Sequence, residues 1–382
     1  MDDDEYHYAT SFGLRKIEIL LVGILAIVYF YLRYNHGDPL LVAGLGFVLA
    51  LWAIMKPTEW AVEGLTLFAY RAGIGTYAAG VLGSLMANLP ELVLASILIL
   101  KGQTGLGILT VLMVAGANTL LFGVVTVRNT LRAGGTVKVP VTTLKYESEL
   151  MLVAFMTSIF LLVFNLAESI EGRLVTSADG LPSLKIPVLF SIGTVLIYCA
   201  YLGFLINDDS LNPDISDDDR IKIKKEPALG WKNIGKFLFF GTLGVLIAGE
   251  LLANGAEILI HQSEQSGVKL NEAQIALIVG FLGSLPEWAI AFRADDIELV
   301  FGSVLSSISA TLLFMIGLVS IILFVAKKDF ILDPYGLVQI VLSGGVLLFV
   351  NTIMKDDEKL DTFEGLCIVI LQLVGFEVLL SV

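Results

Sequence analysis

Charged residues are scarce in this chain, and their scarcity excludes an ordinary soluble domain. Asp, Glu, Lys and Arg make up 16% of its 382 residues, whereas about a quarter is usual in soluble domains. Hydrophobic residues make up 56%, and apolar runs of about 20 residues, the length that crosses a bilayer, recur along the whole chain. The composition therefore predicts a polytopic, all-α membrane protein whose surroundings are the lipid bilayer.

Cysteine and histidine are also rare, with two and three residues respectively. Cys199 and Cys367 fall inside apolar runs without CxxC spacing, so we interpret both as small apolar fillers. His7, His36 and His261 are far apart and predict no zinc site. Basic residues are outnumbered by acidic ones, and the net charge of −13 argues against a nucleic-acid partner.

The apolar runs predict eleven membrane-spanning helices. The first run follows Arg15 and Lys16 and has no small-residue cleavage pattern after it, so it predicts a retained span and not a signal peptide. The second and seventh are long enough to tilt or to extend beyond the bilayer. The predicted spans are 15–34, 39–70, 74–100, 104–127, 147–167, 184–206, 233–262, 271–293, 297–326, 335–353 and 361–381.

One long polar segment, residues 207–232, divides the chain into two halves. The predicted organisation is an N-terminal tail and extra helix at 1–36, a first five-helix half at 37–206, this linker, and a second five-helix half at 233–382. The aspartates at 207–219 lack the glycine and the spacing of an EF-hand loop. A solvated linker is the simpler interpretation, and a regulatory role stays open.

Lysine and arginine predict the orientation. The N-terminus and the loops after even-numbered spans carry sixteen of them, and the opposite side carries seven. Positive charge collects in cytoplasmic loops, which places the N-terminus and the linker in the cytoplasm and the C-terminus outside, with the cell membrane as the expected location.

Two short stretches resemble each other: "NLPELVLA" at 88–95 and "SLPEWAIA" at 284–291. They lie in the third and eighth spans. Because five spans separate the copies, the two must cross the membrane in opposite directions. This is an inverted repeat, which is typical of many secondary transporters.

The proline of each copy predicts a helix break. Pro90 and Pro286 have no N–H, so the carbonyls four residues earlier lose a partner. A freed carbonyl inside a membrane has to face protein, water or an ion. The expected carbonyl ligands are Met86, Ala87, Leu282 and Gly283.

The glutamates of the two copies, Glu91 and Glu287, predict a cation site. A charged group at the bilayer centre costs about 2.5–3.5 kcal/mol on insertion scales, so its presence indicates function. Facing glutamates cannot both stay charged and empty in a low dielectric, so a cation or a proton has to occupy the pair. The side-chain oxygens expected beside them belong to Asn88, Asn118, Ser284, Ser307 and Thr311. An all-oxygen set fits a hard cation, and Ca²⁺ fits best.

The stretches "GSLMANLPELVLASILILKG…AGANTLLFG" and "GFLGSLPEWAIAF…GSVLSSISATLLF" resemble the two α-repeats of the calcium/cation antiporter superfamily. The extra first span and the acidic linker resemble the proton/calcium branch, and "SLPE" resembles the sodium/calcium branch. The resemblance implies that Glu91 and Glu287 are the central ligands, assisted by Asn88, Asn118 and Ser284. It also implies that the long second and seventh spans slide across a fixed site. The chain departs from the family at "MANLPE", which lacks two usual hydroxyls.

The predicted function is therefore antiport of Ca²⁺ against Na⁺ or H⁺ at a midplane site, without enzymatic activity and without a cofactor. A Na⁺/H⁺ exchanger on the same fold is the first alternative. An intramembrane carboxylate enzyme is more distant, because no Gly-x-Gly-Asp motif is present, and a channel is a further possibility.

Simpler interpretations of single residues stay open. Serine and threonine in spans often bond to their own helix, which applies to Ser307 and Thr311. Glu250, Asn254 and Glu257 share one helical face and indicate either an access path or an interfacial position.

Overall fold

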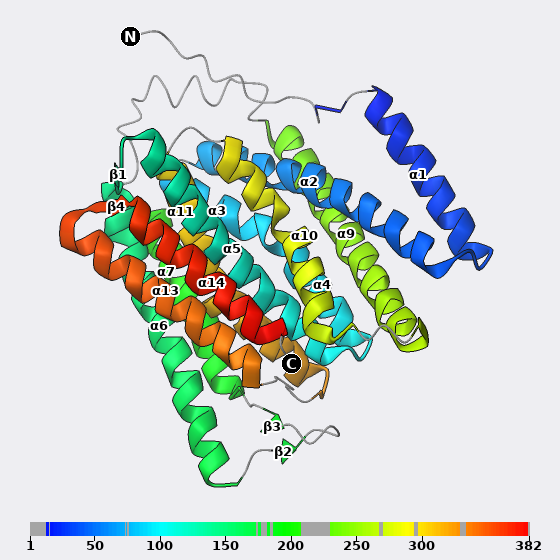
Figure 1. The fold of residues 1–382 in the computed structure, drawn as a ribbon. Helices are drawn as coiled ribbons and strands as arrows, with labels where there is room; N and C mark the ends of the chain where they lie inside the picture. Colours follow the sequence, from blue (N-terminus) through cyan, green and yellow to red (C-terminus); the bar gives the residue numbers. More distant parts are fainter. Residues whose placement is uncertain are drawn as a thin grey trace.

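The computed structural model describes residues 13–14, 16–72, 74, 76–172, 175–176, 182–183, 186–207, 230–266, 270–293, 297–328 and 334–380. This part of the chain is almost entirely helical (Figure 1). Ten of its helical segments are long and apolar enough to cross a membrane, and a further helix, α10, occupies the predicted eighth span. The prediction of a polytopic helical membrane protein is confirmed.

The first half contains α1 (Lys16–Tyr34), α2 (Pro39–Ala72), α3 (Thr76–Ala87), α4 (Leu89–Leu100), α5 (Thr104–Arg132), β1 (Thr136–Lys138), α6 (Val141–Ile170), β2 (Val175–Thr176), β3 (Pro182–Ser183) and α7 (Val188–Asn207). The second contains α9 (Trp231–Ser266), α10 (Glu272–Arg293), α11 (Ile297–Ala310), the π-helical turn η3 (Thr311–Met315), α12 (Ile316–Val325), α13 (Pro334–Asp357), β4 (Lys359–Asp361) and α14 (Thr362–Leu380).

Several helices differ from their predicted spans. The predicted span 74–100 is two helices, α3 and α4, while 297–326 is α11, η3 and α12 in series. Helix α6 begins earlier than predicted, at Val141, and α5 continues to Arg132, because both helices run past the apolar run into more polar residues. The division into halves stays a prediction, since residues 208–229 of the linker and 1–12 of the N-terminal tail lie outside the described residues.

The extra N-terminal helix α1 lies at the edge of the bundle, and most of it is exposed (Figure 1). It packs against α2. Tyr29 is buried against Gly46 of α2, and the indole N–H of Trp52 donates to the Glu18 carboxylate over 2.8 Å. The first predicted span is thus an added helix outside the paired halves.

The centre of the bundle is α5, which is buried along nearly all of its length. It packs against α10 and α14 of the second half, while α11 and α12 pack against α3 and α7 of the first half. Helices of the first half therefore pack directly against helices of the second half.

The two Pro–Glu segments run in opposite directions, as an inverted repeat requires. An added Cβ at Gly105, near the start of α5, would lie 2.6 Å from the carboxylate of Glu272 at the start of α10. The turn that follows α4 is therefore at the end of the bundle where α10 begins, so α4 and α10 are antiparallel (Figure 1).

A short antiparallel pair of strands ties the halves together at the end where α6 and α14 begin. Strand β1 pairs with β4 so that Val137 lies opposite Leu360, and both side chains are buried. The neighbouring hydroxyls of Thr130 and Thr362 are 2.9 Å apart.

The long helices α2 and α9 form the most extensive helix pair in the described structure. Their close approach depends on small residues. A Cβ at Gly241 would lie 2.5 Å from the backbone nitrogen of Ala61, and one at Gly244 would lie 2.2 Å from Cβ of Pro57. No side chain larger than hydrogen fits at either place without separating the helices.

We expect Gly241→Ala to destabilise the protein by about 1–3 kcal/mol, because overpacking a tight contact costs this much. The control is Gly235→Ala on the same helix, where an added Cβ meets nothing within 4 Å and alanine favours the helix. Thermal unfolding in detergent measures both variants. Equal melting temperatures for the two would show that the α2–α9 contact is not close-packed.

Candidate cation-binding site

The first Pro–Glu segment is a broken helix. Two backbone bonds cross the junction between α3 and α4: the Asn88 N–H donates to the Ser84 carbonyl over 3.1 Å, and the Leu92 N–H to the Asn88 carbonyl over 3.4 Å. The Met86 carbonyl has no N–H four residues ahead of it, because that position is Pro90. The prediction of a break at Pro90 therefore agrees with the structure.

The second Pro–Glu segment is not broken. Helix α10 is continuous through Pro286, so the expectation of a break in this copy is wrong. A proline removes one hydrogen bond, and the bonds on either side of it keep the helix intact. The Leu282 carbonyl still lacks a partner, because residue 286 is a proline without an N–H. The Gly283 carbonyl, in contrast, lies opposite the N–H of Glu287 in the continuous helix.

Glu91 and Glu287 are both buried, with 1% of each residue exposed. A Cβ at Gly283 of α10 would lie 3.0 Å from both Cγ and Oε1 of Glu91, so this glycine makes the room into which the Glu91 side chain fits. Glu287 lies one turn further along α10, on the same face as Gly283. The ion pairs found among the described residues involve neither glutamate.

Ser307 of α11 connects the two halves of the site. The amide nitrogen of Asn118 donates to its hydroxyl oxygen over 2.8 Å. The hydroxyl in turn lies 2.9 Å from Oδ1 of Asn88 and 3.3 Å from Oε1 of Glu287. It carries a single hydrogen, so it donates to one of these two acceptors at a time.

Several acceptor oxygens in the site have no hydrogen-bond partner. They are both carboxylate oxygens of Glu91, Oε2 of Glu287 and Oδ1 of Asn118, and all are shielded from solvent. An isolated carboxylate is costly to bury without a counter-charge. This arrangement of unpaired oxygens is suited to a hard cation, or to protons when no cation is bound.

Two predicted ligands use their hydroxyl hydrogens within their own helices. The Ser284 hydroxyl donates to the Phe281 carbonyl over 3.1 Å, and that of Thr311 to the Ser307 carbonyl over 2.9 Å. Both residues are buried near the site, and the π-helical turn begins at Thr311. Both hydroxyls thus bond to nearby backbone, which was the simpler of the two interpretations. Their role as cation ligands stays a prediction.

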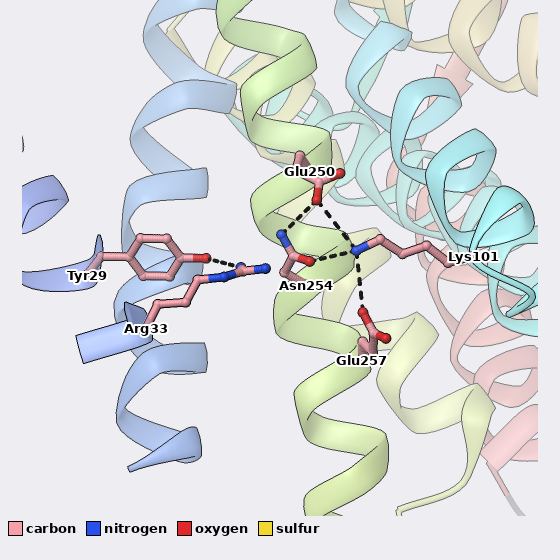
Figure 2. A network of polar contacts seen from close by, with 6 residues as sticks. All are labelled: Tyr29, Arg33, Lys101, Glu250, Asn254 and Glu257. Atoms are coloured by element: carbon pink, nitrogen blue, oxygen red, sulfur yellow. Dashed lines mark hydrogen bonds and ion pairs between the residues drawn. The ribbon is translucent and has the colours of Figure 1, made fainter. Parts of the chain in front are cut away.

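The polar face of α9, which carries Glu250, Asn254 and Glu257, contacts Lys101. In Figure 2, the side chain of Lys101, just after α4, reaches across to α9. Its ammonium lies 3.5 Å from the Glu250 carboxylate, 3.3 Å from that of Glu257 and 2.6 Å from Oδ1 of Asn254. These residues therefore link the end of α4 to α9, and both the access path and the interfacial position stay open for this face.

One buried carboxylate was missed by the sequence analysis. Glu147 of α6 is fully buried and accepts hydrogen bonds from the hydroxyls of Tyr77 and Tyr201. Glu147 is the first residue of the predicted span 147–167, where a glutamate resembles an interfacial residue. Its partners come from α3 and α7, so no local pattern indicated its burial.

Comparison with known proteins gives a family and a fold. The sequence profile of the sodium/calcium exchanger protein family matches residues 42–207 and 238–375. No curated protein sequence matches. Among solved structures, the H⁺/Ca²⁺ exchanger CAX is similar with a TM-score of 0.66 at 17% identity, over 97% of this chain and 93% of that one.

Two other structures are similar over comparable lengths. YfkE has a TM-score of 0.63 at 16% identity, over 95% of this chain and 99% of its own. The sodium-calcium exchanger NCX_Mj has a TM-score of 0.59 at 16% identity, over 88% of this chain and 98% of its own. At this level of identity the likeness shows a shared fold.

We expect Ser307→Ala to lower the free energy of unfolding by about 1–3 kcal/mol, since it deprives buried polar partners of their hydrogen bond. Ser158→Ala is the control: that hydroxyl is also buried but bonds only to the Ala154 carbonyl of its own helix. Denaturation in detergent measures the two. Equal losses would mean that the Ser307 hydroxyl does not hold the site together.

Proposed function

The chain belongs to the sodium/calcium exchanger protein family, and we propose that it is a secondary antiporter that carries Ca²⁺ between Glu91 and Glu287 in exchange for Na⁺ or H⁺. The observation that carries the proposal is the pair of buried glutamates, on helices of opposite direction, whose oxygens are largely unpaired. The site is proposed to lie near the middle of the membrane.

The ligand set supports a divalent ion. Ca²⁺ takes six to eight oxygens in flexible geometry. Two carboxylates supply up to four oxygens, and Asn118 and the carbonyls of Met86 and Ala87 can supply others. Two ionised glutamates would neutralise one Ca²⁺ or two monovalent cations.

The same charges account for coupling. Two like charges about 4 Å apart repel by about 4 kcal/mol at an effective dielectric constant of about 20. An empty, doubly ionised pair is therefore unstable inside the bundle, so the site has to take up Na⁺ or H⁺ before it can return. This requirement ties one flux to the other and suppresses leak.

Alternating access is proposed to involve α2 and α9 moving together past the remaining helices. Support comes from the extensive contact between the two and from the place where α9 crosses the site. A Cβ at Gly249 would lie 2.6 Å from the Val93 side chain and 3.1 Å from the backbone nitrogen of Leu94, so α9 passes directly over the turn of α4 that carries Glu91.

A second candidate is exchange of monovalent cations, Na⁺ against H⁺, at the same site. The geometry favours it in one respect. Asn88, Asn118 and Ser307 bond to one another, so part of the neutral oxygen set is already engaged. A monovalent cation needs fewer ligands than Ca²⁺.

We expect Glu91→Gln and Glu287→Gln each to reduce cation exchange by about 100-fold or more, because removing one member of a buried charge interaction costs about 3–5 kcal/mol. The control is Glu377→Gln on the exposed face of α14, which should exchange normally. Flux of radioactive Ca²⁺ into proteoliposomes measures all three. Exchange retained in either site variant would place transport elsewhere.

We also expect Ca²⁺ flux to saturate with Ca²⁺ concentration and to stop when neither a Na⁺ nor a H⁺ gradient opposes it. The physical reason is that the emptied pair of carboxylates has to be refilled before the site returns. The same proteoliposomes provide the measurement. Linear flux without a counter-ion would indicate a channel.

A further inference from the structure

Glu147 forms a second buried acidic centre, separate from the cation site. The residue is 0% exposed. Its Oε1 accepts hydrogen bonds from the hydroxyls of Tyr77 over 3.0 Å and Tyr201 over 2.8 Å. Its Oε2 is shielded from solvent and has no partner. One half of the carboxyl group is thus fully satisfied and the other half is unpaired.

No cation neutralises Glu147 among the described residues. Helix α3 presents Tyr77, α7 presents Tyr198 and Tyr201, and α11 presents Ser306. On α6 itself, Lys145 is exposed and bonds to the hydroxyl of Tyr146.

The remaining packed elements add no buried charge to this centre. The charged residues near the end of α13, Lys355, Asp356 and Asp357, are exposed, and η3 has no titratable residue. A carboxylate this deeply buried and without a counter-charge has to be neutralised by what it binds.

The surrounding groups select a proton over a metal ion. Both phenols direct their hydrogens, and not their lone pairs, at the carboxylate. The centre contains a single carboxylate, whereas Ca²⁺ needs six to eight oxygen ligands. A proton needs only Oε2 and leaves both bonds to Oε1 in place.

Hydroxyl groups lie between Glu147 and the cation site. The ring of Tyr198 lies 6.0 Å from that of Tyr201, which bonds to Glu147. The hydroxyls of Tyr198 and of Ser306 on α11 are both buried and have no hydrogen-bond partner. Ser306 is adjacent in sequence to Ser307, which bonds to Asn88, Asn118 and Glu287.

Glu147 is also close to one end of the bundle. Tyr77 is the second residue of α3, and Glu147 is the seventh of α6. Both helices begin at this end, and α3 then leads to the break at Asn88.

We infer that Glu147 is a proton-binding residue that passes protons between this end of the bundle and the Glu91–Glu287 pair, which makes H⁺ the counter-ion. A proton from solvent binds Oε2 and moves along the hydroxyls of Tyr198 and Ser306 to the vacated glutamates. The inference rests on the proposed antiport and specifies its second ion.

The test compares Glu147→Gln with Glu149→Gln, an exposed carboxyl two residues away on the same helix. In proteoliposomes, Ca²⁺ exchange driven by a pH gradient should fall about 100-fold in Glu147→Gln, the lower range for loss of a positioned proton-transfer group. It should be unchanged in Glu149→Gln. Calorimetric Ca²⁺ binding should be unaffected in both variants.

Infrared spectroscopy tests proton binding without transport. The carboxylic acid C=O band that changes with pH in the unmodified protein should lose one component in Glu147→Gln and none in Glu149→Gln. If Glu147→Gln does not fold, Tyr201→Phe replaces it, with slower H⁺-driven exchange and a shifted pH profile expected.

Three outcomes separate the claims. A wild-type rate and pH profile in Glu147→Gln, or an unaltered infrared band, overturns the inference. Ca²⁺ exchange driven by Na⁺ and not by H⁺ also overturns it but leaves the proposed antiport intact. No Ca²⁺ movement under either gradient overturns the antiport, and the infrared band then decides whether Glu147 binds a proton.

Discussion

Two acidic side chains enclosed in a membrane-spanning bundle, with no basic residue paired to them in the described structure, set the main physical constraint on this molecule. Their repulsion in a low dielectric makes the empty, charged state unstable. A bound cation or proton is therefore needed to neutralise the two carboxylates. Coupling of one ion flux to another is explained by the instability of the empty, doubly charged pair, and it does not require a high affinity for one particular ion.

The fold serves this constraint by bringing the glutamates together from oppositely directed helices. Glycine at position 283 makes the room for Glu91, and crosswise packing of α5 and α11 brings Asn118 and Ser307 to the same place. Small residues also let α9 cross α2 and α4 at short distance. Close backbone approach therefore both builds the site and keeps α9 directly against the helix that carries Glu91.

The two copies of the repeat are not equivalent. In the first, the helix is interrupted at Asn88 between α3 and α4, whereas α10 continues through Pro286. In the second, Ser307 takes the bridging position, and the π-helical turn begins four residues later, at Thr311.

The sequence by itself determined the helical membrane architecture and the inverted repeat, because hydropathy, span parity and the paired Pro–Glu motif are properties of the chain alone. It also predicted a site at Glu91 and Glu287, both of which are buried in the structure. It also indicated the break before Pro90. Only the tertiary structure decided that α10 stays continuous, that Ser307 is the residue joining Asn88 to Asn118, that Lys101 bridges to α9, and that Glu147 is buried between tyrosines from α3 and α7. Each of these depends on contacts between residues far apart in the chain, which local patterns of polarity do not encode.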